Sequence, residues 1–363
     1  MLDSTFASQP LIGRQAELQQ ISRILQDDGD LLLTGVPGSG RQRLIWSAAE
    51  QVGARVLRID CMRATNAARF LELLAEGLLD VFSAPAELEL IQRWSAGLPI
   101  VLESSLTRRA RLTWHSSTDT QWELFQLLLS LPQAMAEWLD CRAVLVFQNF
   151  PHIRSWDKQR QWETYLQQEI QRQSRVSYAL IATVPGDWVS DIPLPVITLG
   201  PLPPGELKPW VVEQMSQQGL DFEPEGHALN LFYSSVQGHP AGAMQLSRRL
   251  WLDSCALHPK GLLIQPHHVH RSTLALVEDL SVTFESLILL LPPSQVRVLE
   301  SLALDPTDSP HARDYIKKHQ LSRGGGLQGA LAALEQKGLL YGAQYGYQIA
   351  MPFLTFWLKH RLA

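Results

Sequence analysis

The residues best suited to chemistry in this sequence lie in a glycine-rich turn that follows the apolar run 31–33. Its members have the order of a phosphate-binding loop, namely Gly35, Val36, Pro37, Gly38, Ser39, Gly40, Arg41 and Gln42. Glycines let backbone N–H groups approach an anion, and the helix expected after the turn adds its positive N-terminal end. The sequence therefore predicts a cradle for phosphate groups.

Two side chains that such a loop uses are absent. Arg41 stands where a lysine would reach the β- and γ-phosphates, and Gln42 stands where a hydroxyl would hold Mg²⁺. A guanidinium can pair with a phosphate, but its planar fork does not replace a lysine point charge. We therefore expect ATP or ADP as the ligand, with Mg²⁺ poorly held.

The elements that must position this loop follow an alternating pattern of apolar runs and amphipathic stretches. The runs predict strands at 30–34, 55–60, 143–147, 178–183 and 196–199. The amphipathic stretches predict helices at 14–26, 42–52, 67–79, 121–139 and 158–174. This order predicts an α/β domain with a mostly parallel five-stranded sheet over residues 1–200. Segment 87–120, which contains Arg108, Arg109 and Arg111, fits no regular pattern and is interpreted as an insertion.

The Pro-rich segment 200–206 indicates a domain boundary, because it cannot continue a helix or strand. Beyond it the pattern predicts helices at 206–218, 224–235 and 241–252, which form a helical lid domain over 201–275. A solvated linker is expected around 258–270. The last part, 280–363, has the order of a winged helix, with helices at 294–303, 312–318 and 327–337, a turn at 321–326 and two short strands within 338–349.

Four landmarks in a fixed order carry a resemblance to a known class. They are Leu11-Ile12-Gly13-Arg14, the glycine loop, the strand and turn 143–150, and Gly238-His239-Pro240. Together they resemble the AAA+ and STAND classes of P-loop ATPases, in particular the branch of origin-recognition initiators and archaeal-type ATPases. The resemblance implies that Ile12, Gly13 and Arg14 frame an adenine base, that Pro240 lies against it, and that Thr183 occupies a polar sensor position.

The departures from this class fall where catalysis would take place. At the end of strand 143–147 the class has an acidic pair, one member for the metal and one to activate water, whereas this chain has the neutral Gln148 and Asn149. Neither amide can serve as a base. Segment 184–193 lacks the arginine finger of ring-forming members. Because each such electrostatic contact is worth about 3 kcal/mol, their joint loss predicts that ATP hydrolysis is negligible. The amides are more simply explained as strand-end groups that hydrogen-bond a neighbouring loop.

The winged helix offers few groups for reading DNA. Arg323 and Gln328 lie near the first turn of the expected recognition helix, and Lys317 and Lys318 could contact phosphates. The wing, 341–347, is aromatic and nearly uncharged, which favours a protein-facing surface. Nucleic acid therefore remains an alternative partner, and protein partners are the preferred one.

The composition of the chain disfavours several kinds of protein. The chain has 363 residues, 45% of them hydrophobic, and a formal net charge of -5, which disfavours a nonspecific polyanion binder. The first residues lack a signal-peptide pattern and no apolar run is long enough to span a membrane, so we expect a cytoplasmic protein. A zinc site is a weaker alternative for a group of residues that fits no compact zinc module: Cys255, His258, His267, His268 and His270.

The leading hypothesis is a regulatory scaffold or adaptor with a degenerate ATPase site, which binds nucleotide without efficient turnover and has no catalytic residue or metal. An oligomer is left open. One alternative is an ATP-dependent switch completed by another subunit, with Asp60, Asp119 or Glu123 as substitute carboxylates. The other is a DNA-binding component similar to initiators or transposition regulators.

Overall fold

The structure, a computed structural model, describes residues 11–105, 108–114, 121–170, 173–186, 194–255 and 262–362. The chain forms two compact units. The sheet unit comprises Gln15–Thr34 and Leu44–Thr198. The loop unit comprises Gly35–Arg43, Leu199–Ala363 and the stretch that ends at Arg14. The glycine loop is therefore grouped with the C-terminal half of the chain.

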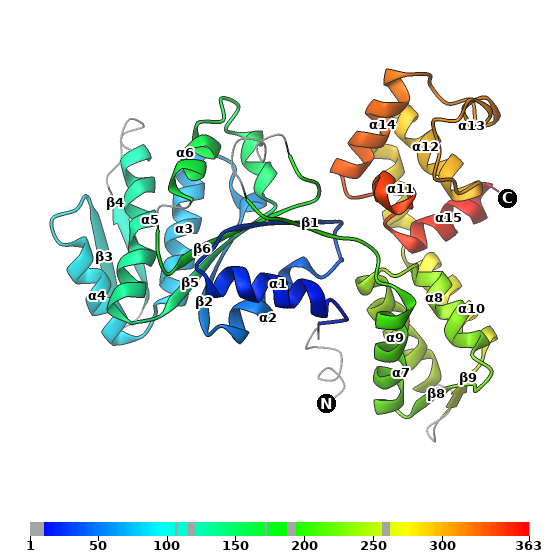
Figure 1. Cartoon of the computed structure of the whole chain (residues 1–363), viewed down its shortest axis with the longest axis horizontal. Coiled ribbons are helices and arrows are strands. Elements are labelled where there is room, and N and C mark those ends of the chain that lie inside the picture. Colours follow the sequence, from blue (N-terminus) through cyan, green and yellow to red (C-terminus); the bar gives the residue numbers. More distant parts are fainter. Residues whose placement is uncertain are drawn as a thin grey trace. The chain divides into compact units, whose positions relative to one another are not determined.

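The sheet unit contains the expected five-stranded sheet, in the order β2-β5-β6-β1-β7 (Figure 1). The strands are β1 (Leu31–Gly35), β2 (Ala54–Asp60), β5 (Arg142–Gln148), β6 (Val176–Ala182) and β7 (Val196–Leu199). β2 pairs with β5, β5 with β6, and β6 with β1, each in parallel. Strands buried on both faces are continuous apolar runs, which explains the strong sequence signal.

Helices cover this sheet on both sides, as Figure 1 shows. They are α1 (Gln15–Gln26), α2 (Arg41–Gln51), α3 (Ala67–Val81), α5 (Gln121–Trp138) and α6 (Gln161–Glu169). The first two lie on one side and the other three on the opposite side. The helix predicted at 158–174 is shorter than expected, because its first turn starts only after Arg160, which has a left-handed φ of 56°.

An aromatic cluster fills the core between α3, α5 and the sheet. The ring of Phe70 lies 5.7 Å from Phe125, 6.1 Å from Phe147 and 5.7 Å from Trp156, measured between centroids. Phe70 is almost fully buried. This cluster fixes β5, which ends at Gln148, the first of the two predicted strand-end amides, against the helices.

Where the structure describes it, segment 87–120 is structured, which corrects the interpretation of an irregular insertion. It holds the end of α4 (Pro85–Ser95) and an antiparallel hairpin of β3 (Ile100–Ser105) and β4 (Arg108–Trp114). The hairpin is anchored through buried Ile100 and Leu112. Charged residues lie among the apolar ones in these short strands, so the alternation of apolar and polar residues typical of a strand is hard to recognise in the sequence.

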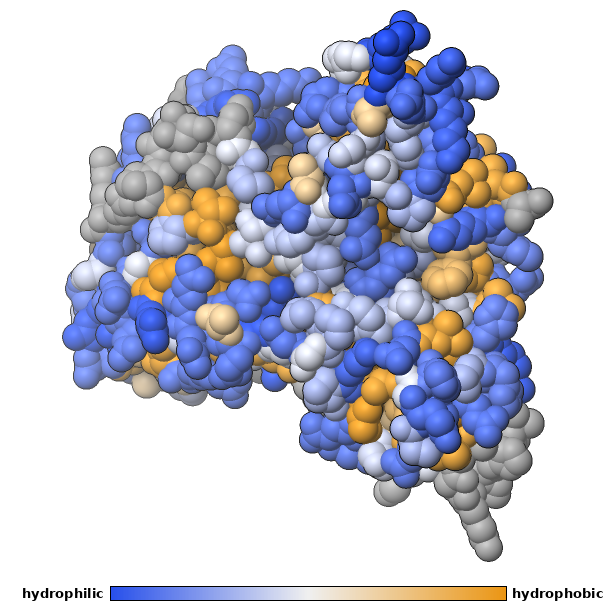
Figure 2. Space-filling view, turned by 45° about the vertical axis from the view of Figure 1, so that its right-hand side comes forward, coloured by the Kyte–Doolittle hydropathy of each residue, from blue (hydrophilic) through white to orange (hydrophobic). Residues whose placement is uncertain are grey.

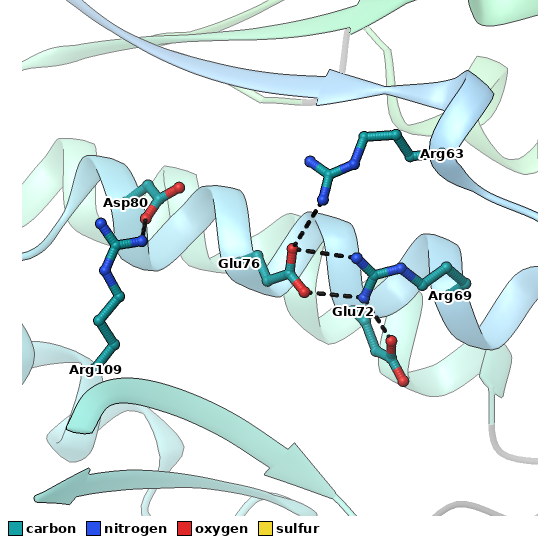
Figure 3. Close-up of polar contacts among 6 residues, drawn as sticks. All are labelled: Arg63, Arg69, Glu72, Glu76, Asp80 and Arg109. Atoms are coloured by element: carbon teal, nitrogen blue, oxygen red, sulfur yellow. Dashed lines mark hydrogen bonds and ion pairs between the residues drawn. The ribbon is translucent and has the colours of Figure 1, made fainter.

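The exposed face of α3 beside this hairpin carries a network of charges (Figure 3). Arg69 lies 2.7 Å from Glu72 and 2.9 Å from Glu76, and Arg109 of β4 lies 3.5 Å from Asp80. Exposed ion pairs of this kind contribute little to stability. The apolar contacts, rather than these pairs, hold the hairpin in place.

The loop unit contains the lid and the winged helix. Its helices are α7 (Pro204–Gln217), α8 (His227–Val236), α9 (Pro240–Cys255), α10 (Pro266–Asp279), α11 (Ser281–Leu290), α12 (Pro293–Leu304), α13 (Arg313–Lys318), α14 (Gly325–Gln336) and α15 (Pro352–Leu362). The short strands β8 (Leu220–Phe222) and β9 (Leu262–Ile264) pair in parallel. Where the structure describes it, the expected linker 258–270 is thus largely β9 and the start of α10.

The prediction of two wing strands within 338–349 is wrong. Only an isolated bridge joins Leu340 to Ile349, and a 3-10 turn, Ala343–Tyr345, lies between them. Gly346 and Tyr347 both have positive φ values, 68° and 50°, which interrupt an extended backbone. Within the described part of the chain, no helix combines the length and the apolar character that crossing a membrane requires.

Candidate phosphate-binding site

The backbone of the glycine loop has the conformation that its sequence implies. Gly38 and Gly40 have φ values of +83° and +94°, in the left-handed region where side chains are strained. A Cβ on Gly38 would lie 2.6 Å from Cε1 of His239, whereas a Cβ on Gly40 would meet nothing within 4 Å. His239 therefore leaves no space for a side chain at position 38. At position 40, glycine is favoured only by the backbone conformation.

That neighbour, His239, joins the lid to the loop. Its Nε2 lies 2.9 Å from the carbonyl oxygen of Pro37, and its Nδ1 accepts a hydrogen bond of 3.0 Å from the N–H of Gly242. Because a carbonyl can only accept and the Gly242 N–H can only donate, the neutral ring carries its proton on Nε2. The N–H of Ala241 also donates to the carbonyl of Gly38, at 3.2 Å.

The predicted adenine-framing segment forms a tight turn against the start of the lid. Gly13 and Arg14 have φ values of 60° and 65°. The backbone N–H of Arg14 donates to Oε2 of Glu206 at 2.8 Å, and its guanidinium donates to the carbonyl of Gly200. Glu206 was not anticipated. A Cβ on Gly13 would lie 2.3 Å from its carboxylate oxygen, and the φ of +60° already disfavours a side chain at this position.

These parts enclose a cavity of about 340 Å³. It is lined by Leu11, Ile12, Arg14, Pro37, Gly38, Ser39, Gly40, Arg41, Gln42, Arg43, Pro240, Ala241 and Met244. One part of this set is apolar, and the other contains three arginines. The lining contains no carboxylate among the residues that the structure describes. The cavity thus brings together the predicted framing segment, the loop and Pro240.

Burial changes the electrostatics of this cavity. Loss of solvent lowers the pKa of the Arg41 guanidinium to about 10. A desolvated cation is costly unless an anion or strong acceptors compensate it. Arg41 therefore adds a partly desolvated positive charge to the wall of the cavity.

Residues of the wing also pack beside the loop. Val36 forms a small buried apolar cluster with Tyr341 and Ala350, and Tyr345 packs against it. Burial raises the pKa of the Tyr341 hydroxyl, and the charge of Arg14 opposes that shift. The sequence had marked the wing as an aromatic surface without identifying this contact.

In the sheet unit, the amides at the end of β5 lie at the carboxyl edge of the sheet. Gln148 is 5% exposed and pairs in register with Asp60 of β2. The next residue, Asn149, has a left-handed φ of 52° and donates from Nδ2 to Oδ1 of Asp60 at 3.0 Å. Asn149 thus makes a strand-end hydrogen bond of the structural kind. Thr183 is half-buried, directly after β6.

The other carboxylates named as substitutes are placed differently. Glu123 lies exposed on α5, and Asp119 lies outside the described residues. Asp60 alone of the three is seen at the carboxyl edge of the sheet, where the amide of Asn149 already occupies one of its oxygens. Residues 187–193 of the segment without an arginine finger also lie outside the described residues.

The winged-helix candidates all lie at the surface: Lys317, Lys318, Arg323 and Gln328. Lys318 forms an ion pair of 2.6 Å with Asp305, which also contacts His319. Part of its charge is therefore neutralised within the domain. Across the described residues, no group of three or more His, Cys, Asp or Glu side chains gathers that could hold a metal, although His258 and the side chain of Cys255 lie outside them.

The buried ring of His239 predicts a pH dependence of stability. Burial lowers its pKa below the ordinary value of 6.5, although the hydrogen bond to Pro37 opposes this shift. The unfolded chain then binds the proton more tightly, so stability from the neutral ring is present above about pH 6.5 and is lost as the pH falls through the lowered pKa. Between about pH 7.5 and about pH 5.5, we expect the difference in unfolding free energy between wild type and His239→Gln to shrink.

Denaturant unfolding at a series of pH values measures this difference. His267→Gln, an exchange of a histidine on α10 away from the loop, serves as the control and should leave the pH profile unchanged. A constant difference across the range would show that His239 does not titrate differently in the folded state.

The chain has the fold of the P-loop ATPases of the AAA+ type, followed by a C-terminal winged helix domain. Residues 282–360 match the family model described as a probable winged helix domain. No curated protein matches the chain in sequence.

Two solved structures show the likeness in detail. The Walker-type ATPase of Pyrococcus abyssi superposes with a TM-score of 0.68 at 16% identity, covering 98% of this chain and 100% of its own. The ORC2 protein of Aeropyrum pernix gives a TM-score of 0.50 at 13% identity, covering 99% of each chain. At such identities the likeness shows the fold, and the function has to be argued from the residues of the site.

Proposed function

We propose that this chain is a nucleotide-binding regulatory scaffold, which holds ATP or ADP at its glycine loop without efficient hydrolysis. The observation that carries the proposal is the composition of the cavity: a glycine cradle and three arginines, with no carboxylate in the described lining. Backbone N–H groups and guanidinium groups bind phosphate oxygens, so the cavity is suited to binding the unreacted nucleotide. The ORC2 protein of Aeropyrum pernix, which shares the fold, was solved in complexes with ADPNP and ADP.

A catalytic Mg²⁺ does not fit these residues. Mg²⁺ requires octahedral oxygen ligands and is usually held by carboxylates together with the phosphates. In the loop, an amide at Gln42 replaces the hydroxyl, and at the end of β5 the side chains of Gln148 and Asn149 are neutral. Hydrolysis that depends on a metal ion is therefore not expected at this site.

A bound nucleotide would instead act as a structural element. Its phosphates would contact the loop, and its base would meet the apolar wall that includes Ile12, Pro240 and Met244. These residues come from three separate stretches of the loop unit. Occupancy would therefore tie the framing turn, the loop and α9 together, which suits a scaffold more than a motor.

An exposed apolar helix favours protein partners for this scaffold. The second half of α11 is a run of apolar residues, and Leu289 and Leu290 at its end are 79% and 82% exposed. Val282, near the start of the helix, is 72% exposed as well. Exposed apolar side chains that gather in this way are typical of contact surfaces for other proteins. Figure 2 shows that other apolar residues also form separate patches among hydrophilic ones on the face in view.

Calorimetry and a steady-state hydrolysis assay test the proposed function. We expect saturable binding of ATP and ADP, with phosphate release from ATP at the background rate. Arg41→Ala should weaken binding by about 10- to 100-fold, because a charge-assisted contact is worth about 1.5–3 kcal/mol. The exposed Arg297→Ala provides the control. Robust Mg²⁺-dependent turnover that disappears in Arg41→Ala would refute the proposal and favour the alternative of an active switch.

A DNA-binding role is the second candidate, because Arg323, Gln328 and Lys317 remain exposed at the turn before α14 and around it. Duplex binding that weakens steeply with salt and with the neutralisation of these residues would favour it. The ion pair of Lys318 with Asp305 reduces the charge available there.

A further inference from the structure

The charge of the cavity distinguishes between two forms of a nucleotide. Arg14, Arg41 and Arg43 all line it, and the described lining contains no acidic residue. A terminal phosphate carries about 1.5 to 2 negative charges at neutral pH, and the inner phosphate adds another. Magnesium cancels two of these charges when it binds. The cationic wall is therefore better matched to a nucleotide that carries no metal.

Two buried polar atoms at the loop point to the same ligand. Nε of Arg43 and Oγ of Ser39 are shielded from solvent, and neither has a hydrogen-bond partner among the described residues. Buried polar atoms are almost always paired, so an unpaired donor in a cavity wall indicates a ligand that supplies the acceptor. Phosphate oxygens are acceptors, whereas a hydrated metal ion offers donors and repels a guanidinium.

Arg43 lies at the third position of α2, directly after the loop. Helix N-termini present unpaired N–H groups and a positive dipole, and a guanidinium in the first turn adds a full charge to them. Arg41 precedes it by two residues, and both line the cavity. The two guanidinium groups therefore come from the same helical turn that receives the phosphates.

We propose that this site binds nucleotide without metal, and that Arg43, together with Arg41, supplies the positive charge that Mg²⁺ provides in other phosphate-binding loops. This inference rests on the proposed nucleotide binding and specifies that the nucleotide is bound without a metal ion. Arg43 was not singled out in the sequence, although its place in the first turn after the loop could have drawn attention to it.

The first test compares ADP binding by the full chain in EDTA and in excess MgCl₂, by calorimetry. We expect ADP to bind at least as tightly in EDTA, and saturating Mg²⁺ to weaken it, because the metal has to be removed first. Tighter binding with Mg²⁺ would overturn the inference while leaving nucleotide binding intact. An absence of binding in both buffers would refute the proposed function itself.

The second test changes Arg43. In EDTA, Arg43→Gln should weaken ADP binding by about 10- to 100-fold and flatten its salt dependence, and Arg43→Lys should recover part of the loss. Arg297→Gln, an exposed arginine on α12, should leave the affinity unchanged. Thermal unfolding without nucleotide verifies that each variant is folded. Unchanged ADP affinity in folded Arg43→Gln would overturn the role of this residue.

Discussion

Gly38→Val is expected to abolish measurable nucleotide binding and to destabilise the loop unit by about 3 kcal/mol or more. Two costs add at this position. The φ of +83° is strained for any β-branched residue, and the new Cβ would lie 2.6 Å from the ring of His239 and 2.9 Å from Cβ of Ala241. Because the hydrogen bond from His239 holds the Pro37 carbonyl in place, relief of this clash displaces the cradle itself. Calorimetry with ADP and urea unfolding measure the two effects.

Gly53→Val is the matched control for backbone strain. Gly53 also has a positive φ, +66°, but a Cβ there meets nothing within 4 Å, and the residue belongs to the sheet unit. This control should cost only the conformational strain, about 1–2 kcal/mol, and should retain nucleotide binding. Equal losses in both variants would mean that the contact with His239 adds nothing.

Phe70→Ala is expected to destabilise the sheet unit by about 3–5 kcal/mol. The ring is almost fully buried and lies within 6.1 Å of Phe125, Phe147, Trp156 and Trp162. Its removal leaves a cavity where helices α3 and α5 meet β5, and aromatic neighbours cannot easily collapse into it. Urea unfolding followed by tryptophan fluorescence reports this region directly, because Trp156 and Trp162 surround the site.

Val101→Ala serves as the comparison for this core substitution. Val101 is 59% exposed on the hairpin, so its truncation should change stability by no more than about 0.5 kcal/mol. A loss of similar size in both variants would show that the aromatic cluster does not determine the stability of the sheet unit.

The sheet was predictable because its signal is local. Strands buried on both faces leave uninterrupted apolar runs, and each predicted strand lies within two residues of β1, β2, β5, β6 or β7 at either end. The glycine loop was equally accessible, since the spacing of Gly35, Gly38 and Gly40 is contiguous in the chain. In both cases, residues adjacent in the sequence are enough to predict the local structure.

Contacts between distant residues could not be derived in this way. The role of His239 depends on Pro37, about two hundred residues earlier, and that of Glu206 depends on Arg14. The same holds for the hairpin at 100–114, whose strands are specified by packing on α3 and α4 more than by their own pattern. The prediction of two wing strands was wrong for a different reason. Apolar and aromatic residues suggested strands where Gly346 and Tyr347 turn the chain.

The packing of Val36 against Tyr341 and Ala350 places the winged helix domain and the anion cradle in one mechanical assembly. A macromolecule that binds Tyr341 and moves its ring would change the packing of the glycine loop. A small molecule that makes the loop more rigid would in turn make that ring harder to displace. If both ligands bind, thermodynamic reciprocity requires that each changes the binding free energy of the other by the same amount.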